Sequence, residues 1–172
     1  MTNRFRVSLA FAVAGLLALA CFGATPVFPG HPRRPKPGSG NVAFETLVQR
    51  SIPGQQGDQV RQVVRDASAW KDNWFRLRER DSGTLPHQEP RVDFSKDMVI
   101  VAAMPTQSCI SKVTVQQIVH NPGEVVVTLL EAPPAVNCVC IVSQRPVHVV
   151  RLPKTADPVR FEAVRGVTPC GR

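Results

Sequence analysis

Apolar residues in the second half of the chain follow the patterns of strands rather than of helices. Residues 98–104 are apolar throughout, which predicts a buried central strand over Asp97–Met104. Alternating or mainly apolar segments follow, and they predict strands over residues 112–120, 124–131, 139–143, 147–152 and 158–164. Pro122-Gly123 separates the first two of these segments in an order typical of a type II turn, so we expect them to form a hairpin.

The first half of the domain shows one strand pattern and one helical pattern. Val42–Ser51 alternates as a strand does, and we expect Pro53-Gly54 to end it. Apolar residues then recur at helical spacing along one face: Val60, Val63, Val64, Ala67, Trp70, Trp74 and Leu77. The tryptophans, Trp70 and Trp74, are therefore expected to pack into the core rather than to form a ligand platform.

Asp66 is placed to cap a helix, because its side chain can accept hydrogen bonds from the free N–H groups of a first turn. This predicts a helix over Ala67–Arg78 preceded by a strand over Val60–Arg65. One continuous helix from Asp58 is the alternative. About six or seven short strands and one helix predict an α+β fold. We expect a mainly antiparallel sheet, rolled or folded into a sandwich, with the helix covering one face.

The N-terminal 20 residues follow the plan of a secretory signal peptide. Two arginines precede an uncharged, mostly apolar run over residues 7–20, which is shorter than the roughly 20 apolar residues needed to span a bilayer. Ala18 and Ala20 are small, as signal peptidases require, and Cys21 follows directly. This order resembles a lipoprotein signal, so we expect lipid on Cys21. An ordinary signal followed by an incidental cysteine is the alternative.

Residues 21–40 form a predicted tether between the signal and the folded domain. Nine of the nineteen residues that follow Cys21 are Pro or Gly, so the segment can neither build a core nor hold a helix. The chain therefore divides into a signal peptide over 1–20, a tether over 21–40 and one β-rich domain over 41–172. Lipid on Cys21 would anchor the domain at a membrane of the cell envelope; without lipid, we expect a periplasmic or secreted protein.

The net charge of +8 is concentrated near the N-terminus. The sequence has 21 basic and 13 acidic residues, and residues 1–40 hold five of the basic and none of the acidic ones, which leaves 16 basic and 13 acidic residues in 41–172. The basic residues of the domain are scattered, and no aromatic stacking platform accompanies them. We therefore expect no nucleic-acid partner.

Four cysteines remain in the domain if Cys21 carries lipid, and an even number in an exported chain predicts two disulfides. Cys138 and Cys140 would point to the same face of a strand, so they should not bond each other. Their partners are then Cys109 and Cys170, in either of two pairings. A four-cysteine zinc site is the alternative, but the Cys-x-x-Cys spacing is missing, and we expect no metal.

Two segments are similar to the motifs of a known family. Val92–Ile100 reads VDFSKDMVI. It resembles VDFSKEMVI, the entry to the C-terminal domain of the PrcB family, whose members are subunits of bacterial surface protease complexes. Residues 143–153, SQRPVHVVRLP, resemble the family's closing P-[YH]-hVV-hP pattern, and the tryptophan region and the Gly123 hairpin are similar as well. The resemblance covers roughly residues 43–162, although Gln107-Ser108-Cys109 departs from the family's Gly-Gly-Tyr. It implies non-catalytic assistance to an exported protease or assembly.

The sequence contains no catalytic signature. None of the four histidines lies in a nucleophile motif, and Gly-x-Ser-x-Gly, His-Glu-x-x-His and phosphate-binding glycine loops do not occur: the histidines are His31, His87, His120 and His148. We expect His148 to be a structural histidine within an apolar strand, and Asp93 to cap or turn the chain into the strand at 97–104. The chain is therefore predicted not to be an enzyme and to need no cofactor.

Two functions from different classes fit these observations. The first is a tethered adaptor that assembles or stabilises a partner protein, and the family resemblance suggests that this partner is an exported protease. The second is a proteinase inhibitor whose loops at Pro105–Ser108 and Pro133-Pro134 enter a protease cleft. Disulfides would hold such loops rigid and so lower the entropic cost of binding.

Lipidation of Cys21 is tested by metabolic labelling with a fatty-acid probe. Because the thiol of Cys21 is the atom that is acylated, we expect the wild-type protein to be labelled and to sediment with membranes. Cys21→Ser should lose both properties. A wild-type protein that takes up no label and is released entirely into the medium would contradict the prediction.

Overall fold

Eight strands and one helix make up the part of the chain that the computed structural model describes, residues 40–54, 56–79, 81, 83 and 85–170. In chain order they are β1 (Gly40–Asn41), β2 (Glu45–Pro53), β3 (Val60–Val64), α1 (Ala67–Arg78), β4 (Asp97–Ala103), β5 (Lys112–Asn121), β6 (Glu124–Ala132), β7 (Gln144–Pro153) and β8 (Val159–Arg165). The predicted signal peptide, Cys21 and nearly all of the predicted tether lie outside the described residues. Within the described ranges, no helix is long and apolar enough to cross a membrane.

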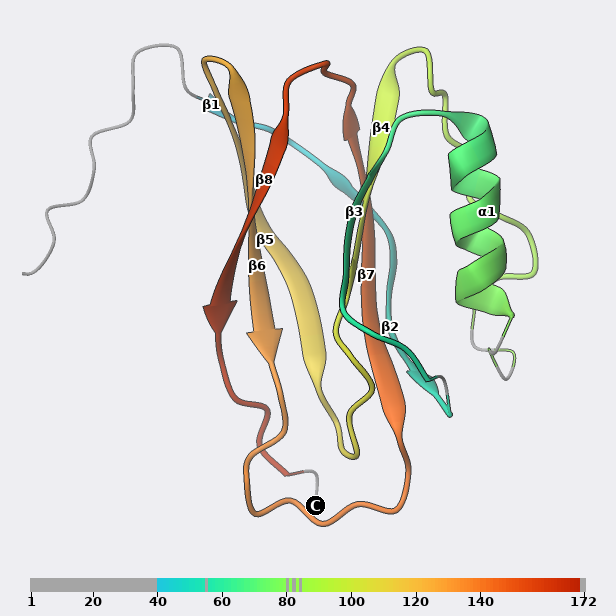
Figure 1. Ribbon diagram of the computed structural model, residues 1–172, viewed down its shortest axis with the longest axis vertical. Coiled ribbons are helices and arrows are strands. Elements are labelled where there is room, and N and C mark those ends of the chain that lie inside the picture. The colour runs from blue at the N-terminus through green and yellow to red at the C-terminus, as the bar shows by residue number, and fades with distance from the viewer. Residues whose placement is uncertain (1–39, 55, 80, 82, 84, 171–172) are drawn as a thin grey trace, which may run out of the picture. The chain divides into compact units, whose positions relative to one another are not determined.

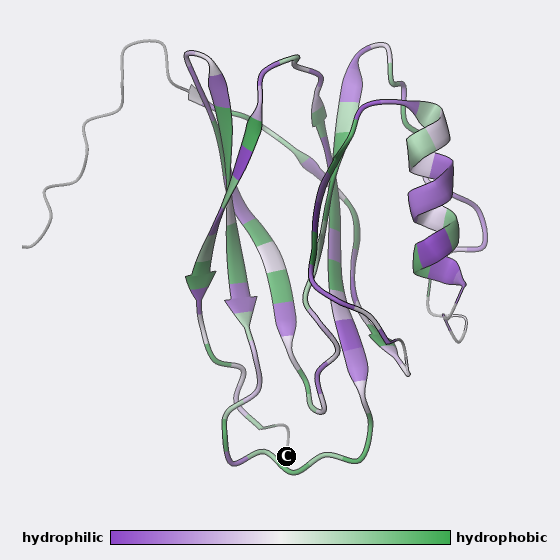
Figure 2. Ribbon diagram, in the orientation of Figure 1, coloured by the Kyte–Doolittle hydropathy of each residue, from purple (hydrophilic) through white to green (hydrophobic). Residues whose placement is uncertain are grey.

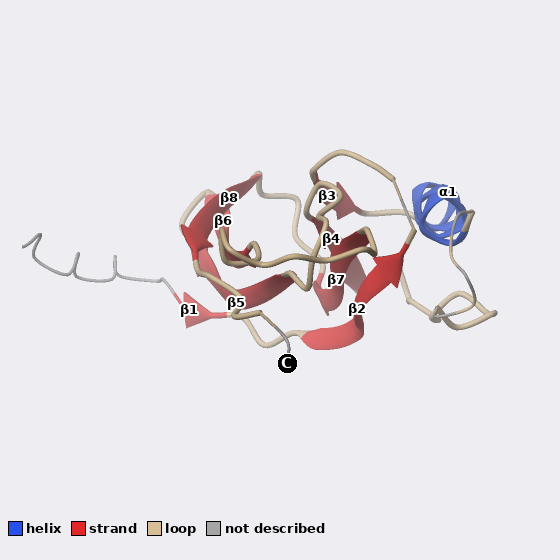
Figure 3. Ribbon diagram, turned by 90° about the horizontal axis from the view of Figure 1, so that it is seen from below, coloured by secondary structure: helices blue, strands red, loops and turns tan. Residues whose placement is uncertain are grey.

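The strands form two four-stranded sheets that pack face to face (Figures 1 and 3). The order is β1-β5-β6-β8 in the first sheet and β2-β7-β4-β3 in the second. Helix α1 covers the outer face of the second sheet, so Figure 3 shows three layers side by side. The predicted α+β fold, a β-sandwich with one covering helix, is confirmed.

Strand β4 lies in the middle layer and is buried on both faces. Alternate residues point into the core between the two sheets: Met98, Ile100 and Ala102. The residues between them point into a second core beneath α1: Val99, Val101 and Ala103. A strand that is covered on both faces needs no polar side, which explains the unbroken apolar run in its sequence.

Helix α1 begins where the sequence predicts. Asp66 has an extended backbone (φ −146°, ψ 160°), and its carboxylate accepts a hydrogen bond from the N–H of Ala69 at 2.8 Å. This bond satisfies one of the free donors of the first turn. Strand β3 directly precedes the cap, so the alternative of one continuous helix from Asp58 is wrong.

The tryptophan pair is part of the core, as predicted. Trp70, Trp74 and Leu77 are all buried against the second sheet. The two indole rings lie with their centroids 5.6 Å apart. Trp70 also donates a hydrogen bond from Nε1 to the carbonyl of Pro90 at 3.1 Å, which fastens the segment between α1 and β4 over the helix.

The predicted strand over residues 139–143 is wrong. The segment belongs to the connection between β6 in the first sheet and β7 in the second, so it passes across the end of the sandwich and has no strand beside it to pair with. Strand β7 begins at Gln144 instead, and it includes Pro146, which pairs with Ser51 of β2.

The last predicted strand is confirmed to within one residue, but β8 pairs with β6 in parallel rather than antiparallel. Strand β7 carries the chain to the end of the sandwich where β6 starts, so β8 then runs in the same direction as β6. The N–H of Val125 donates to the carbonyl of Pro158 at 2.9 Å and ties the starts of the two strands together. With the short β1, the described residues form eight strands rather than six or seven.

His148 on β7 is a structural histidine between the two sheets, and it is 2 % exposed. Its Nδ1 accepts a hydrogen bond from the N–H of Val115 at 2.7 Å. The proton of the neutral ring is therefore assigned to Nε2, which donates to Oγ1 of Thr46 at 3.0 Å. Both partners lie at irregularities of the strand register, between Thr46 and Val48 and between Val115 and Gln117. His148 thus satisfies a backbone donor at the β5 bulge.

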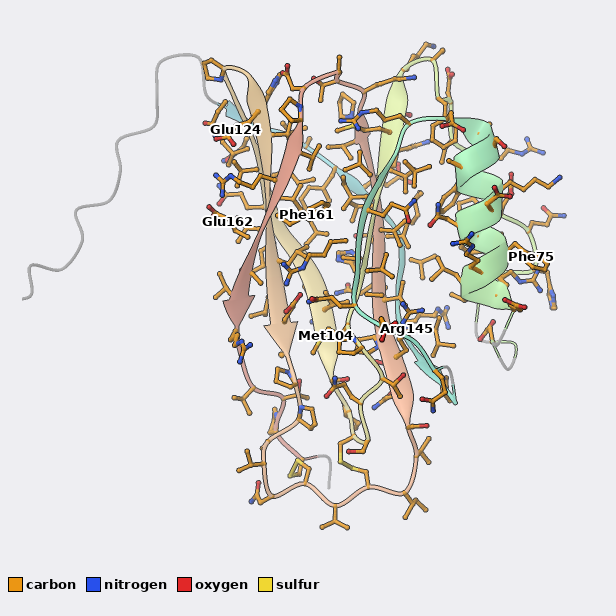
Figure 4. All side chains as sticks on the ribbon, in the orientation of Figure 1. Phe75, Met104, Glu124, Arg145, Phe161 and Glu162 are labelled. Carbon is orange, nitrogen blue, oxygen red and sulfur yellow. A yellow bond between two sulfur atoms is a disulfide. The ribbon has the colours of Figure 1, made fainter. Side chains whose placement is uncertain are left out.

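Trp74→Ala should lower the free energy of unfolding by about 3 to 5 kcal/mol, because it leaves a cavity beneath α1. Phe75→Ala is the matched control: Phe75 is the next residue on the same helix, is 66 % exposed and points away from the sheet in Figure 4. Its loss should change stability by less than about 0.5 kcal/mol. Chemical denaturation measures both, and equal effects would contradict the core position of Trp74.

The free energy of unfolding should decrease as the pH is lowered, because of His148. Burial, helped by the positive charge of Lys112, lowers the pKa of His148 from 6.5 to about 4. Between these values the unfolded chain binds a proton that the folded chain does not. The free energy of unfolding should therefore be at its full value above pH 6.5 and fall by roughly 3 kcal/mol towards pH 4. Denaturation curves across this range test the effect, and an equal decline in His148→Gln would contradict it.

Candidate functional site

Three irregular segments meet at one end of the sandwich. The β4–β5 connection (residues 104–111) and the β6–β7 connection (residues 133–143) both cross between the sheets here. The segment after β8 (residues 166–170) returns to the same end (Figure 1). We call these three segments the bridged end. Because most of their backbone groups cannot join a strand ladder, other interactions must hold them.

Two disulfides tie the three segments together (Figure 4). Cys109 bonds Cys140, with the Cα atoms 5.2 Å apart, and Cys138 bonds Cys170, with the Cα atoms 5.3 Å apart. This is one of the two predicted pairings. Cys138 and Cys140 lie in an irregular connection and not, as predicted, on one strand, but each does bond a separate partner.

Backbone hydrogen bonds fix the base of the β6–β7 connection. Gln107 and Gln144 each donate an N–H to the other's carbonyl at 2.8 Å. Thr168 donates its N–H to the carbonyl of Pro133 at 2.8 Å, and its own carbonyl accepts the N–H of Ala135 at 3.0 Å. The connection is therefore held at one end by the C-terminal segment and at the other by the β4–β5 connection.

Apolar side chains project into solvent from the middle of the β6–β7 connection. Val139 is 95 % exposed and Ile141 is 100 % exposed, and their apolar neighbours are exposed as well: Val136 and Val142. No charged residue occurs between Glu131 and Arg145, and Figure 2 shows the segment mainly in the hydrophobic colour. Each Val or Ile left in water forgoes roughly 1.5 to 3 kcal/mol of burial. Four exposed apolar side chains in one short connection make this segment a candidate binding site.

A groove runs beside the Cys109–Cys140 disulfide. It has a volume of about 390 Å³ and is lined by the disulfide together with Ile110, Val139, Ile141, Val142 and Gln144. A second cleft, also of about 390 Å³, shares Ile110 and is lined by two basic residues, Arg50 and Lys112. The first groove can receive an apolar side chain of a partner, and the basic residues of the second cleft lie beside it.

Sequence reasoning misses the exposed residues of this site. The alternation over Cys138–Ile141 is typical of a strand, which hides the fact that Val139 and Ile141 have no core to face. Cys138 and Cys140 are the sequence signal that could have identified Val139 and Ile141. Because both cysteines bond to segments outside the sheets, the residues beside them have no neighbouring strand.

The described histidines are not arranged as catalytic bases beside a nucleophile. The hydroxyl of the exposed Thr46 meets the buried ring of His148 at Nε2, but Nδ1 of His148 meets an N–H rather than the carboxylate of a triad. His120 lies at the opposite end of the sandwich, with Nε2 2.5 Å from Oδ2 of Asp157. His87 contacts the guanidinium of Arg78. His31 lies outside the described residues.

Asp93 turns the chain into β4, as predicted. Its carboxylate accepts the N–H and the hydroxyl of Ser95, and these hydrogen bonds lower the pKa of Asp93. Its carbonyl accepts the N–H of Asp97 at 2.8 Å. Across the ranges that the structure describes, no group of three or more His, Cys, Asp or Glu side chains is placed to hold a metal ion.

Comparisons of the chain with protein-family models, with curated proteins and with solved structures found no significant match. The resemblance to the PrcB family therefore stays a prediction that rests on the motifs quoted above.

Peptide mapping of the exported protein without reduction should find Cys109 linked to Cys140 and Cys138 linked to Cys170. The bridges span 31 and 32 residues, so each should contribute about 3 to 4 kcal/mol to the free energy of unfolding in the chain-entropy model. Denaturation with and without reductant measures that contribution. Free thiols at these positions, or a Cys109–Cys138 link, would contradict the observed pairing.

Proposed function

We propose that this protein is a non-catalytic protein of the cell envelope that binds a partner protein through the bridged end. The observation that carries the proposal is the middle of the β6–β7 connection, which is apolar and exposed yet tied down by two disulfides. The disulfides indicate an oxidising compartment outside the cytoplasm. A surface that is ordered before it binds loses little conformational entropy on binding.

The composition of the connection favours a protein partner over a lipid surface. Segments that enter a membrane interface usually carry Trp, Tyr, Lys or Arg, which suit the headgroup region. Residues 133–144 contain no aromatic and no charged residue. Short branched side chains on a fixed backbone instead match the shaped apolar pockets of a protein. In this proposal, contact with the membrane is the role of lipid on Cys21.

The nature of the partner is inferred from the resemblance to the PrcB family. That resemblance supports an exported protease or its assembly as the bound protein. The apolar groove would then receive a side chain of the partner, while Val139 and Ile141 enter pockets on it. Burial of these apolar side chains at the centre of an interface would gain the transfer free energy that they lack in water.

A proteinase inhibitor is a second candidate function, and the position of Val139 favours it. Val139 lies between two bridged cysteines and is almost fully exposed, so a protease cleft could reach it on a rigid backbone. The loops predicted for this role lie at the same end, but Pro133 and Pro134 are half-buried at its base. Val139 is therefore a better candidate for the presented residue than either proline, and it suits a protease whose specificity pocket takes a small aliphatic side chain.

Val139→Asp and Ile141→Asp should each weaken binding of the partner about tenfold or more, because they place a charge in an apolar pocket. Phe75→Asp, a substitution of an exposed apolar residue on α1, should leave binding unchanged. Affinity capture from envelope extract with quantitative mass spectrometry identifies the partner, and titration of the purified pair gives the Kd.

The same variants separate the two functions. An adaptor should leave the activity of a bound protease intact, whereas an inhibitor should abolish it, and Val139→Asp should restore it. A partner that binds both aspartate variants as tightly as the wild type would show that the bridged end is not the binding surface.

A further inference from the structure

Arg145, the second residue of β7, is a buried cation without a carboxylate at ion-pair distance. Arg145 is 9 % exposed, and none of the ion pairs formed among the described residues includes it. Nη2 donates to the carbonyl of Asp58 at 2.7 Å, whereas the buried Nε has no partner in the part of the chain that the structure describes. Burying a charge is costly unless an opposite charge compensates it.

The guanidinium of Arg145 is positioned by the loop before β3. A Cβ atom on Gly57 would lie 2.8 Å from Cζ of Arg145, so the guanidinium rests against the backbone of Gly57, where a side chain would collide with it. Gly57 is fixed in turn by Thr106, whose N–H donates to the Gly57 carbonyl at 3.1 Å and whose Oγ1 accepts the Gly57 N–H at 3.0 Å. The donor is therefore held in a preformed frame.

Arg145 lines a cleft between β3, α1 and β7. Odd-numbered residues of β7 face the helix, as Val147 and Val149 do, and Figure 4 labels Arg145 on this side of the sheet. The cleft has a volume of about 150 Å³. Its polar lining is Arg145, Arg76, Gln62 and Asn73, and its apolar lining is Val60, Leu77 and Val101. Among the described residues, two cations and no acid line this space, so its electrostatic potential favours an anion.

We propose that this cleft binds a small aliphatic carboxylate, with Arg145 as the charged hydrogen-bond donor. A guanidinium recognises a carboxylate through two parallel N–H···O bonds. The smallest pockets that take drug-sized ligands have volumes of about 300 Å³. The cleft has half that volume, so it suits a ligand of few atoms or the end of a peptide chain. The apolar wall matches an aliphatic group better than a phosphate.

The surroundings of Arg145 are consistent with this role. Burial lowers the pKa of Arg145, and the charge of Asp58, acting from beyond ion-pair distance, opposes this effect. A bound carboxylate adds a second negative charge at close range. Asn73 donates from Nδ2 to the carbonyl of Ala69 at 2.7 Å, which orients its amide at the wall of the cleft.

Sodium propionate is the probe, titrated at constant ionic strength into the disulfide-bonded protein without its signal peptide. We expect saturable NMR shifts of the side-chain amides of Gln62 and Asn73 in the millimolar range. Arg145→Gln should weaken binding about tenfold to a hundredfold, as the loss of a hydrogen bond to a charged group does. Lys71→Gln, on the same helix but outside the cleft, should leave the affinity unchanged.

Sodium chloride and sodium phosphate are titrated in parallel. Three results with the wild-type protein would overturn the proposal: shifts that do not saturate, shifts that chloride reproduces, and tighter binding of phosphate than of propionate. Unchanged affinity in Arg145→Gln would also overturn it. Val139 does not line the cleft, so Val139→Asp should bind propionate normally, and the outcome is independent of the partner bound at the bridged end.

Discussion

Burial of β4 on both faces is the constraint from which the arrangement of the other elements follows. A strand with two apolar faces needs a covering layer on each side. The first sheet covers one face through the core between the sheets, and α1 covers the other through Trp70 and Trp74. Strand β7 lies beside β4 in the same middle layer, so two of its polar residues, Arg145 and His148, are buried as well and depend on specific hydrogen bonds.

Because two sheets share this core, the chain must cross between them at both ends. At the end where β8 begins, the β1–β2 and β7–β8 connections make the crossings, and the β7–β8 connection is tied to the start of β6. At the bridged end, the middle of the β6–β7 connection and the C-terminal segment lie outside both cores, and two disulfides hold them in place. Val139 and Ile141 are consequently exposed on a fixed backbone, which is the physical basis of the proposed binding role.

The elements that local interactions determine could be predicted from the sequence. Asp66 caps α1, and Gly123 takes the positive φ of 82° that the turn between β5 and β6 requires. Features that depend on distant partners could not be predicted. The strand-like pattern over residues 139–143 says nothing of whether a neighbour lies beside it, and the parallel direction of β8 depends on where β7 ends. The cleft at Arg145 requires Gly57 from another loop, a contact that no sequence pattern records.

Rigidity of the exposed β6–β7 connection distinguishes a binding surface from an ordinary loop. Two disulfides and four backbone hydrogen bonds at its base should hold residues 136–143 as firmly as a strand. Relaxation of backbone amides by NMR measures this directly. We predict order parameters of about 0.85 for these residues in the oxidised protein, like those of β4, and values below about 0.6 once the disulfides are reduced. Values below about 0.6 already in the oxidised protein would contradict a preordered binding surface.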